Sequence, residues 1–212
     1  MSYATCVVLL AAFVAGTFPA TARAQLRATP VDWQTVTSGD LNGVRVTVTG
    51  FETPLLQIIS NRPYTDPAFS AAPLASAEAI EYGAANDWTA TFSQPVNDLV
   101  LYVDLWRGSF VGTPEPSTSY TFNRPFVVLS GLEGGSVSGN TLTLPSPTGN
   151  NFHNGVIQFP GAISSLSVDA IPPAGVIGGS GQILTFAVVP EPGTMALPAL
   201  ALAATLCRRR RA

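Results

Sequence analysis

The sequence predicts an all-β protein, a single antiparallel and jelly-roll-like β-sandwich between an N-terminal signal peptide and a short C-terminal transmembrane helix. Apolar residues recur with period two through the middle of the chain, and clusters of Gly, Pro, Asn and Asp interrupt them. Both ends of the chain are apolar runs. These patterns divide the chain into a signal peptide at 1–24, a β-sandwich body at 25–188 and a C-terminal segment at 189–212.

The period-two pattern is clearest at 44–49 and 99–105, where valine or leucine occupies every second position. Residues 61–73 hold three prolines and are expected to form a loop, and 74–82 has the composition of a helix of about two turns. About eight to ten short strands would fit one sandwich. Further strands are predicted at 88–92, 120–129, 141–144, 155–159, 163–169 and 182–189.

Two segments of the body resemble each other. FSQPVNDLVL at 92–101 and FPGAISSLSV at 159–168 share their apolar positions across a proline-containing bend. We interpret both as bends through which sandwich strands enter the core, and an internal duplication is the alternative. Both interpretations predict the same fold.

The N-terminal segment has the organisation of a secretory signal peptide. An apolar stretch at 4–16 precedes the small-x-small site formed by Ala22 and Ala24, so cleavage leaves Gln25 as the first residue. The secretion translocon and signal peptidase are the expected partners, and a buried N-terminal strand or helix is the alternative. Both cysteines lie in the terminal segments, so the body has no disulfide and must fold by burying apolar surface.

The charge of the body argues against nucleic acid as a ligand. Only 11% of the chain is charged, and there is no lysine. Residues 25–189 contain five arginines and twelve carboxylates, which gives a net charge of −7. Such a surface is repelled by phosphate backbones.

Three elements follow one another at the C-terminus: a Pro-Glu-Pro tripeptide, a 15-residue apolar run at 193–207, and an arginine cluster. The two prolines hold the tripeptide extended, and the arginines resist translocation and remain on the cytoplasmic side. The apolar run is shorter than the roughly 20 residues of a full span, which suits a transient anchor. The residues that carry this pattern are Pro190, Glu191, Pro192, Arg208, Arg209, Arg210 and Arg211.

This order resembles the PEP-CTERM sorting signal. The resemblance implies recognition by an exosortase, cleavage near Pro-Glu-Pro, and transfer of the body to the cell surface or extracellular matrix of a Gram-negative, exopolysaccharide-producing bacterium. An ordinary tail anchor is the alternative. The same tail is sometimes labelled as the C-terminal region of ice-binding proteins, a label that carries no ligand information for the body.

The body offers little support for catalysis, and we expect no enzyme activity and no cofactor. His153 is the only histidine, and neither a nucleophile elbow nor a phosphate-cradling loop accompanies it; we expect a satisfied surface side chain. A glycan hydrolase using two of Asp98, Asp104 and Asp169 is one alternative. We assign no metal ligands, although Asn97, Asp98 and 150–154 offer hard oxygens to a structural Ca²⁺.

Glycan binding would use exposed aromatic rings with polar neighbours. Trp106 is the best candidate, because it ends a predicted strand beside Arg107, and core packing is its alternative role. Thr-x-Thr pairs start at Thr35, Thr47, Thr89 and Thr141 and suggest an ice-facing array, but without a fixed period half-exposed strand faces explain them better.

The sequence therefore predicts an exported cell-surface or matrix protein with a non-catalytic structural or binding role in exopolysaccharide or biofilm. A carbohydrate-binding module with a defined glycan ligand is the main alternative.

Overall fold

The computed structural model describes residues 28–51, 56–83, 87–107, 117–145, 152–171 and 181–189. The predicted cleavage residues Ala22, Ala24 and Gln25, the Pro-Glu-Pro tripeptide, the anchor and the arginine cluster lie outside the described residues. The described elements are β1 (Thr29–Pro30), β2 (Asp32–Thr35), β3 (Ser38–Leu41), β4 (Val44–Thr49), β5 (Gln57–Tyr64), the 3-10 helix η1 (Pro67–Phe69), β6 (Leu74–Gly83), β7 (Trp88–Arg107), β8 (Ser117–Phe122), β9 (Val127–Gly131), β10 (Ser136–Ser138), β11 (Thr141–Pro145), β12 (Phe152–Ile171) and β13 (Gly181–Val188).

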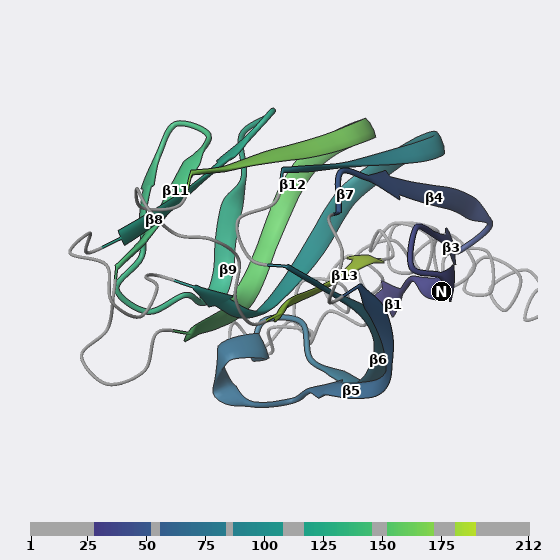
Figure 1. Cartoon of the computed structure of the whole chain (residues 1–212), viewed down its shortest axis with the longest axis horizontal. Coiled ribbons are helices and arrows are strands. Elements are labelled where there is room, and N and C mark those ends of the chain that lie inside the picture. The colour runs from purple at the N-terminus through teal and green to yellow at the C-terminus, as the bar shows by residue number, and fades with distance from the viewer. Residues whose placement is uncertain are drawn as a thin grey trace, which may run out of the picture.

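The strands form one 13-stranded sheet. Its main order is β10-β11-β8-β12-β7-β13-β6-β5, and β4, β3 and β2 extend from the other part of β7 (Figure 1). Every pairing among the described strands is antiparallel. The prediction of an all-β antiparallel fold is therefore confirmed, while the jelly-roll-like strand order stays a prediction.

The two 20-residue strands β7 and β12 run through both layers of the molecule. The first part of β7 pairs with β4 and the second part with β13, while β12 passes from β9 to β8. The first layer therefore contains β4, the start of β7, the end of β12 and β8. The second layer contains β9, the start of β12, the end of β7, β13 and β6.

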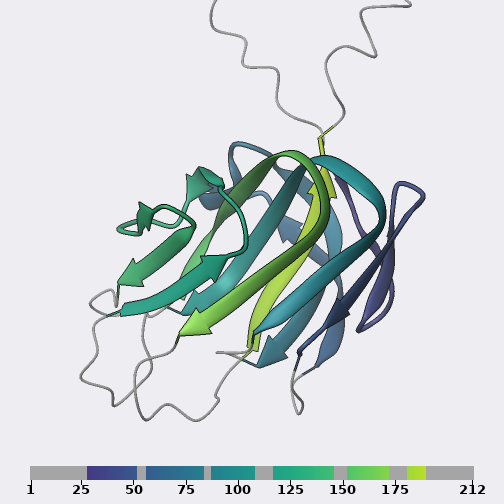
Figure 2. The ribbon, with the colours of Figure 1, turned by 90° about the horizontal axis from the view of Figure 1, so that it is seen from above.

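The bends that join the layers lie side by side (Figure 2). Phe159 pairs with Leu99 and Ile163 with Val96, so the two similar segments are the two bends, as their interpretation predicts. Gly161 adopts a φ of 78°, which glycine tolerates without strain, and its N–H donates to Asp98 Oδ1 over 3.0 Å. This contact ties the two bends together.

The main core lies between the two layers. Phe186 of β13 packs against Trp88 and Phe92 of the first layer, with ring centroids 5.8 and 6.0 Å apart. A second cluster covers the outer face of the second layer, where Tyr64 and Phe69 pack against Tyr102. One outer face is thus covered by residues of β5 and η1, whereas no described element covers the outer face of the first layer.

Several local predictions are wrong. Residues 74–82 form strand β6 and not a helix, and the predicted loop at 61–73 begins as the end of β5. Alanine favours helix, but here Ala77 and Ala79 are buried in the second cluster, so tertiary packing overrides the local preference. The strand predicted at 120–129 is two strands, β8 and β9, which pair with different parts of β12.

Candidate functional site

The outer face of the first layer is rich in hydroxyl groups, and we call it the hydroxyl face. Its side chains alternate along each strand with buried core residues such as Val48, Ala90 and Leu166, so they all project to the outside. None of them is buried. The hydroxyl face consists of Thr47, Thr49, Thr89, Thr91, Ser119, Thr121, Thr141, Thr143, Ser165 and Ser167.

The strand register places these hydroxyls in rows across the sheet. Thr49 pairs with Thr89, which in turn pairs with Ser167. Thr47, Thr91 and Ser165 form the next row in the same way. The Thr-x-Thr pairs that start at Thr47, Thr89 and Thr141 therefore do lie on half-exposed strand faces, and pairing unites them on one face despite their irregular spacing in the sequence.

Part of the hydroxyl face is held rigid by side-chain hydrogen bonds between β8 and β11. The Thr121 and Thr141 hydroxyls lie 3.0 Å apart, and those of Ser119 and Thr143 lie 3.2 Å apart. No hydrogen bond to another described residue is recorded for the hydroxyls of Thr49 and Thr89. Thr49 is exposed and Thr89 is half-buried, so both side chains are accessible from outside.

A hollow of about 480 Å³ lies in the hydroxyl face, where β4, β7, β12 and β8 run side by side. Gly50 ends β4 here with a φ of 94°, and a Cβ at this position would lie 2.3 Å from Asp87 O. The hollow is lined by Thr49, Gly50, Asp87, Trp88, Thr89, Thr121, Phe122, Asn123, Ser167, Val168 and Asp169.

Two polar side chains of the hollow are held in place by backbone groups. The N–H of Ala170 donates to Asp87 Oδ1 over 2.9 Å, and the N–H of Ser167 donates to Asn123 Oδ1 over 3.2 Å. Asp169 is exposed, and its carboxylate has no recorded partner among the described residues. The lining thus carries two carboxylates and no cationic side chain.

Sequence reasoning missed this hollow. Asp87 and Asn123 lie at strand ends and match no motif, and they meet only because β7 and β8 both pair with β12. The Thr-x-Thr pairs were the one available signal, and their spacing along the chain did not reveal the shared face.

Trp106, the predicted glycan contact, is buried, and that prediction is corrected. Its side chain is 0% exposed and packs against the ring of Tyr120, with centroids 4.5 Å apart. Trp33 and Trp88 are buried as well. Because Trp106 alternates with Leu105 at the end of β7, its indole faces the main core, and it offers no platform to a glycan.

The three carboxylates considered for a hydrolase lie apart. Asp98 is at the bend of β7 and Asp104 is six residues further along the same strand, about 20 Å away at ~3.3 Å per residue. Asp169 pairs with Thr121 at the hollow. Glycosidases need two carboxyl groups within about 5–10 Å, so the strand spacing separates Asp98 from Asp104 too widely.

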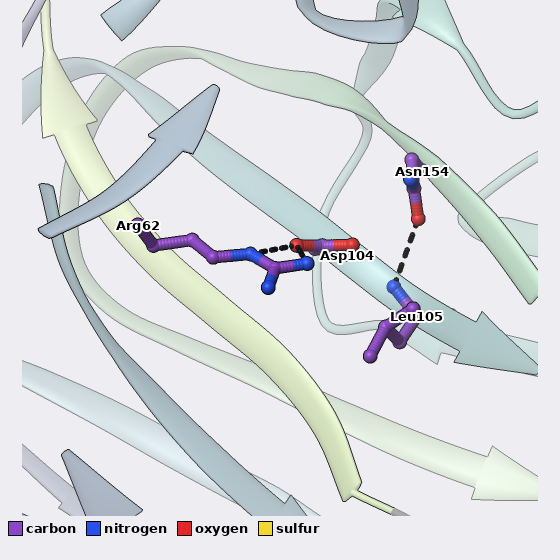
Figure 3. A network of polar contacts seen from close by, with 4 residues as sticks. All are labelled: Arg62, Asp104, Leu105 and Asn154. Carbon is purple, nitrogen blue, oxygen red and sulfur yellow. Dashed lines mark hydrogen bonds and ion pairs between the residues drawn. The ribbon is translucent and has the colours of Figure 1, made fainter. Parts of the chain in front are cut away.

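Asp104 takes part in a polar cluster under β5 (Figure 3). Arg62 donates from Nε to Asp104 Oδ2 over 2.6 Å, and its terminal nitrogen forms an ion pair with the same oxygen. Nearby, the Leu105 N–H donates to Asn154 Oδ1 over 2.9 Å. Burial raises the pKa of Asp104 above its ordinary value of 3.8, and the Arg62 charge opposes that rise.

This shift predicts a pH-dependent stability. Between 3.8 and the raised pKa, the folded state keeps a proton on Asp104 that the unfolded chain has lost, so the free energy of unfolding falls as pH rises through that window. We expect Asp104→Asn to remove this slope. Urea unfolding at several pH values measures it, with Asp169→Asn as a control for the loss of one exposed carboxylate; equal pH slopes in wild type and Asp104→Asn would contradict the prediction.

The remaining candidate residues occupy structural positions. His153 is buried, and not at the surface as expected, and its Nε2 lies 2.8 Å from Pro145 O. Asn97 and Asp98 lie at one end of the second part of β7 and Asn154 at the other, so these three calcium-ligand candidates are not brought together, and the candidates at 150–151 lie outside the described residues. Within the described ranges, no three His, Cys, Asp or Glu side chains gather where a metal could bind.

The C-terminal sorting residues begin where the described body ends. Strand β13 ends at Val188. None of the helices within the described ranges is long and apolar enough to cross a membrane.

Comparison with known families identifies the C-terminal segment. The family model of the PEP-CTERM protein-sorting motif matches residues 188–211, which confirms the resemblance drawn from Pro190 to Arg211. Neither the curated proteins nor the solved structures contain a match to this chain.

Proposed function

We propose that this chain, which carries a PEP-CTERM protein-sorting motif, is an exported cell-surface or matrix protein that contacts exopolysaccharide without chemical turnover. The motif implies export and sorting by an exosortase. One observation supports the rest of the proposal: the motif follows a β-body whose accessible outer face is rich in hydroxyl groups.

The body is built to survive removal of the motif. Strand β13 is hydrogen-bonded to β7 and β6, and its residues from Gly181 to Ala187 are buried. Cleavage near Pro-Glu-Pro falls after Val188, so it leaves β13 whole. The core that Phe186 and Leu184 help to form then stays complete in the processed protein.

The two ends of the body lie together at the bends. Thr29 of β1 pairs with Val188, and Val188 pairs with Leu99 beside the bend of β7. The hollow lies at the other end of the first layer, where β7 begins at Trp88. A body tethered through its C-terminus would therefore carry the hollow away from the membrane.

The intact mass of the native protein in inner-membrane, surface and medium fractions tests this proposal. A surface species that starts at Gln25 and lacks the residues after Pro-Glu-Pro would support it. An unprocessed species confined to the inner membrane would overturn it and indicate an ordinary tail anchor.

The motif itself provides a sharper prediction. We expect Glu191→Ala to abolish processing, because the extended tripeptide loses the one charge that a processing enzyme can recognise there. Immunoblots of the cell fractions should then show full-length protein in the inner membrane only. Glu133→Ala, which removes an exposed glutamate from a turn of the body, is the matched control and should be processed normally.

A further inference from the structure

We infer that the hollow in the hydroxyl face is a binding site for a neutral polysaccharide chain. This inference rests on the proposed function, since it names the kind of exopolysaccharide that the body would contact. The hollow of about 480 Å³ has the size of a small-ligand site and can take a short stretch of sugar units.

The hydrogen-bonding groups of the hollow match those of a sugar. Each threonine or serine hydroxyl both donates and accepts, as sugar hydroxyls do. Thr49, Thr89 and Ser167 present such groups in one row across three strands. Asp169 adds an exposed carboxylate with no hydrogen-bond partner among the described residues, which favours the charge-assisted hydrogen bonds that bind sugar hydroxyls well.

The hollow is also organised before any ligand binds. Asp87 and Asn123 are fixed by the backbone N–H groups of Ala170 and Ser167, and Thr121 is fixed by Thr141. Side chains that are already ordered lose less entropy on binding, so weak individual contacts can add up to measurable affinity.

The charge of the hollow selects against acidic polymers. Among the described residues that line it, the only ionisable side chains are the carboxylates of Asp87 and Asp169, and none is a lysine or arginine. The whole body carries a net charge of −7 between residues 25 and 189. Uronic-acid, sulfated or phosphorylated chains would be repelled, whereas a neutral glycan binds without electrostatic repulsion.

The shape of the face favours a chain over a flat crystal surface. Antiparallel sheets twist by about 20–25° per strand, and here four strands also form an open hollow. Beside it on the same face, Ile171 is 56% exposed and offers apolar contact to the C–H groups of a sugar ring. A flat array of the ice-facing kind would need an untwisted surface.

Affinity electrophoresis of the detergent-solubilised full chain tests the inference, with neutral galactomannan, neutral glucan and polygalacturonate as probes. We expect retardation by a neutral glycan and none by polygalacturonate. Thr49→Val and Thr89→Val each remove a hydroxyl with little change in volume and should each weaken binding about fivefold. Ser167→Tyr fills the hollow and should abolish binding.

Two variants sharpen the test. Thr91→Val lies on the same strand and face as Thr89 but outside the hollow, and it should bind as the wild type does. Asp169→Lys should bring retardation by polygalacturonate, because it changes the charge of the described lining from −2 to 0 and places a cation on the hydroxyl face. Circular dichroism of each variant shows whether it is folded.

The inference is overturned if no neutral glycan retards the folded wild type, or if Thr91→Val weakens binding as much as Thr89→Val does. Failure of the proposed function has a different signature, because it appears as an unprocessed protein in the inner membrane whatever the binding assay shows. If the full chain binds neutral glycan but the native protein is found only unprocessed in the inner membrane, the binding result supports the site and the fractionation result refutes the sorting proposal.

Discussion

Replacing Arg62 with alanine is expected to lower the free energy of unfolding by about 3 kcal/mol. The Asp104 side chain is only 2% exposed, and Arg62 is the one cation recorded in contact with it in the described structure. Without Arg62 a buried carboxylate keeps its desolvation cost and loses its partner. The second carboxylate oxygen, Oδ1, has no hydrogen-bond partner among the described residues, so the carboxylate depends mainly on Arg62 to offset its burial.

Urea unfolding at neutral pH measures this effect. Arg45→Ala, which removes an exposed arginine from β4, is the matched control and should change stability by less than about 0.5 kcal/mol. The double variant Arg62→Leu, Asp104→Leu should recover much of the loss, because it removes both charges. The loss in Arg62→Ala should also shrink at acid pH, where Asp104 takes up a proton. An Arg62→Ala protein as stable as Arg45→Ala would show that the ion pair contributes nothing.

Trp106→Ala is expected to cost about 4 kcal/mol of stability, since it leaves a cavity in a closely packed core. The indole is fully buried and contacts Tyr120 and Phe122, and this aromatic group joins the end of β7 to β8. Its Nε1 has no hydrogen-bond partner in the described part of the chain, so Trp106→Phe keeps most of the packing without losing a hydrogen bond. We expect Trp106→Phe to cost only about 1–2 kcal/mol.

Chemical unfolding followed by circular dichroism measures both variants, because the signal does not depend on the tryptophan that is removed. Glycan affinity of folded Trp106→Phe should equal that of the wild type. A loss of affinity without a loss of stability would mean that the ring contacts a glycan after all, and would return Trp106 to the role that its place at a strand end suggested.

The sequence predicted those features of the fold that depend on short-range pattern. Alternation at 44–49 and 99–105 reports a strand with one buried face, and the structure has β4 and β7 there. Alternation is lost where both faces of a strand are covered, and there neighbouring residues in space decide the local structure. Leu74 to Tyr82 carries no clean alternation, because Ile80 and Tyr82 face the main core while Ala77 and Ala79 face the second cluster.

Long-range pairing explains the errors at the candidate site. The sequence could not distinguish a Trp106 that points outward from one that points inward, because that choice depends on which side of β7 the second layer covers. Nor could it place Asp87 beside Ser167 and Asn123, which are 80 and 36 positions away along the chain. The bends at Asp98 and Gly161 decide the direction of the Trp106 side chain and the residues that meet at the hollow. They do so because they determine where β7 and β12 cross from one layer to the other.

By itself the sequence determined the β character of the body, its negative charge and its C-terminal sorting motif, because each of these depends only on composition or on residues that are adjacent in the chain. Only the tertiary structure decided which outer face is covered and which is bare. Residues of β5 and η1 cover the second layer, and the register of β4, β7, β12 and β8 unites scattered Thr and Ser residues on the uncovered one. The physical reason is that a strand exposes or buries a side chain according to its neighbours in space, which local sequence does not specify.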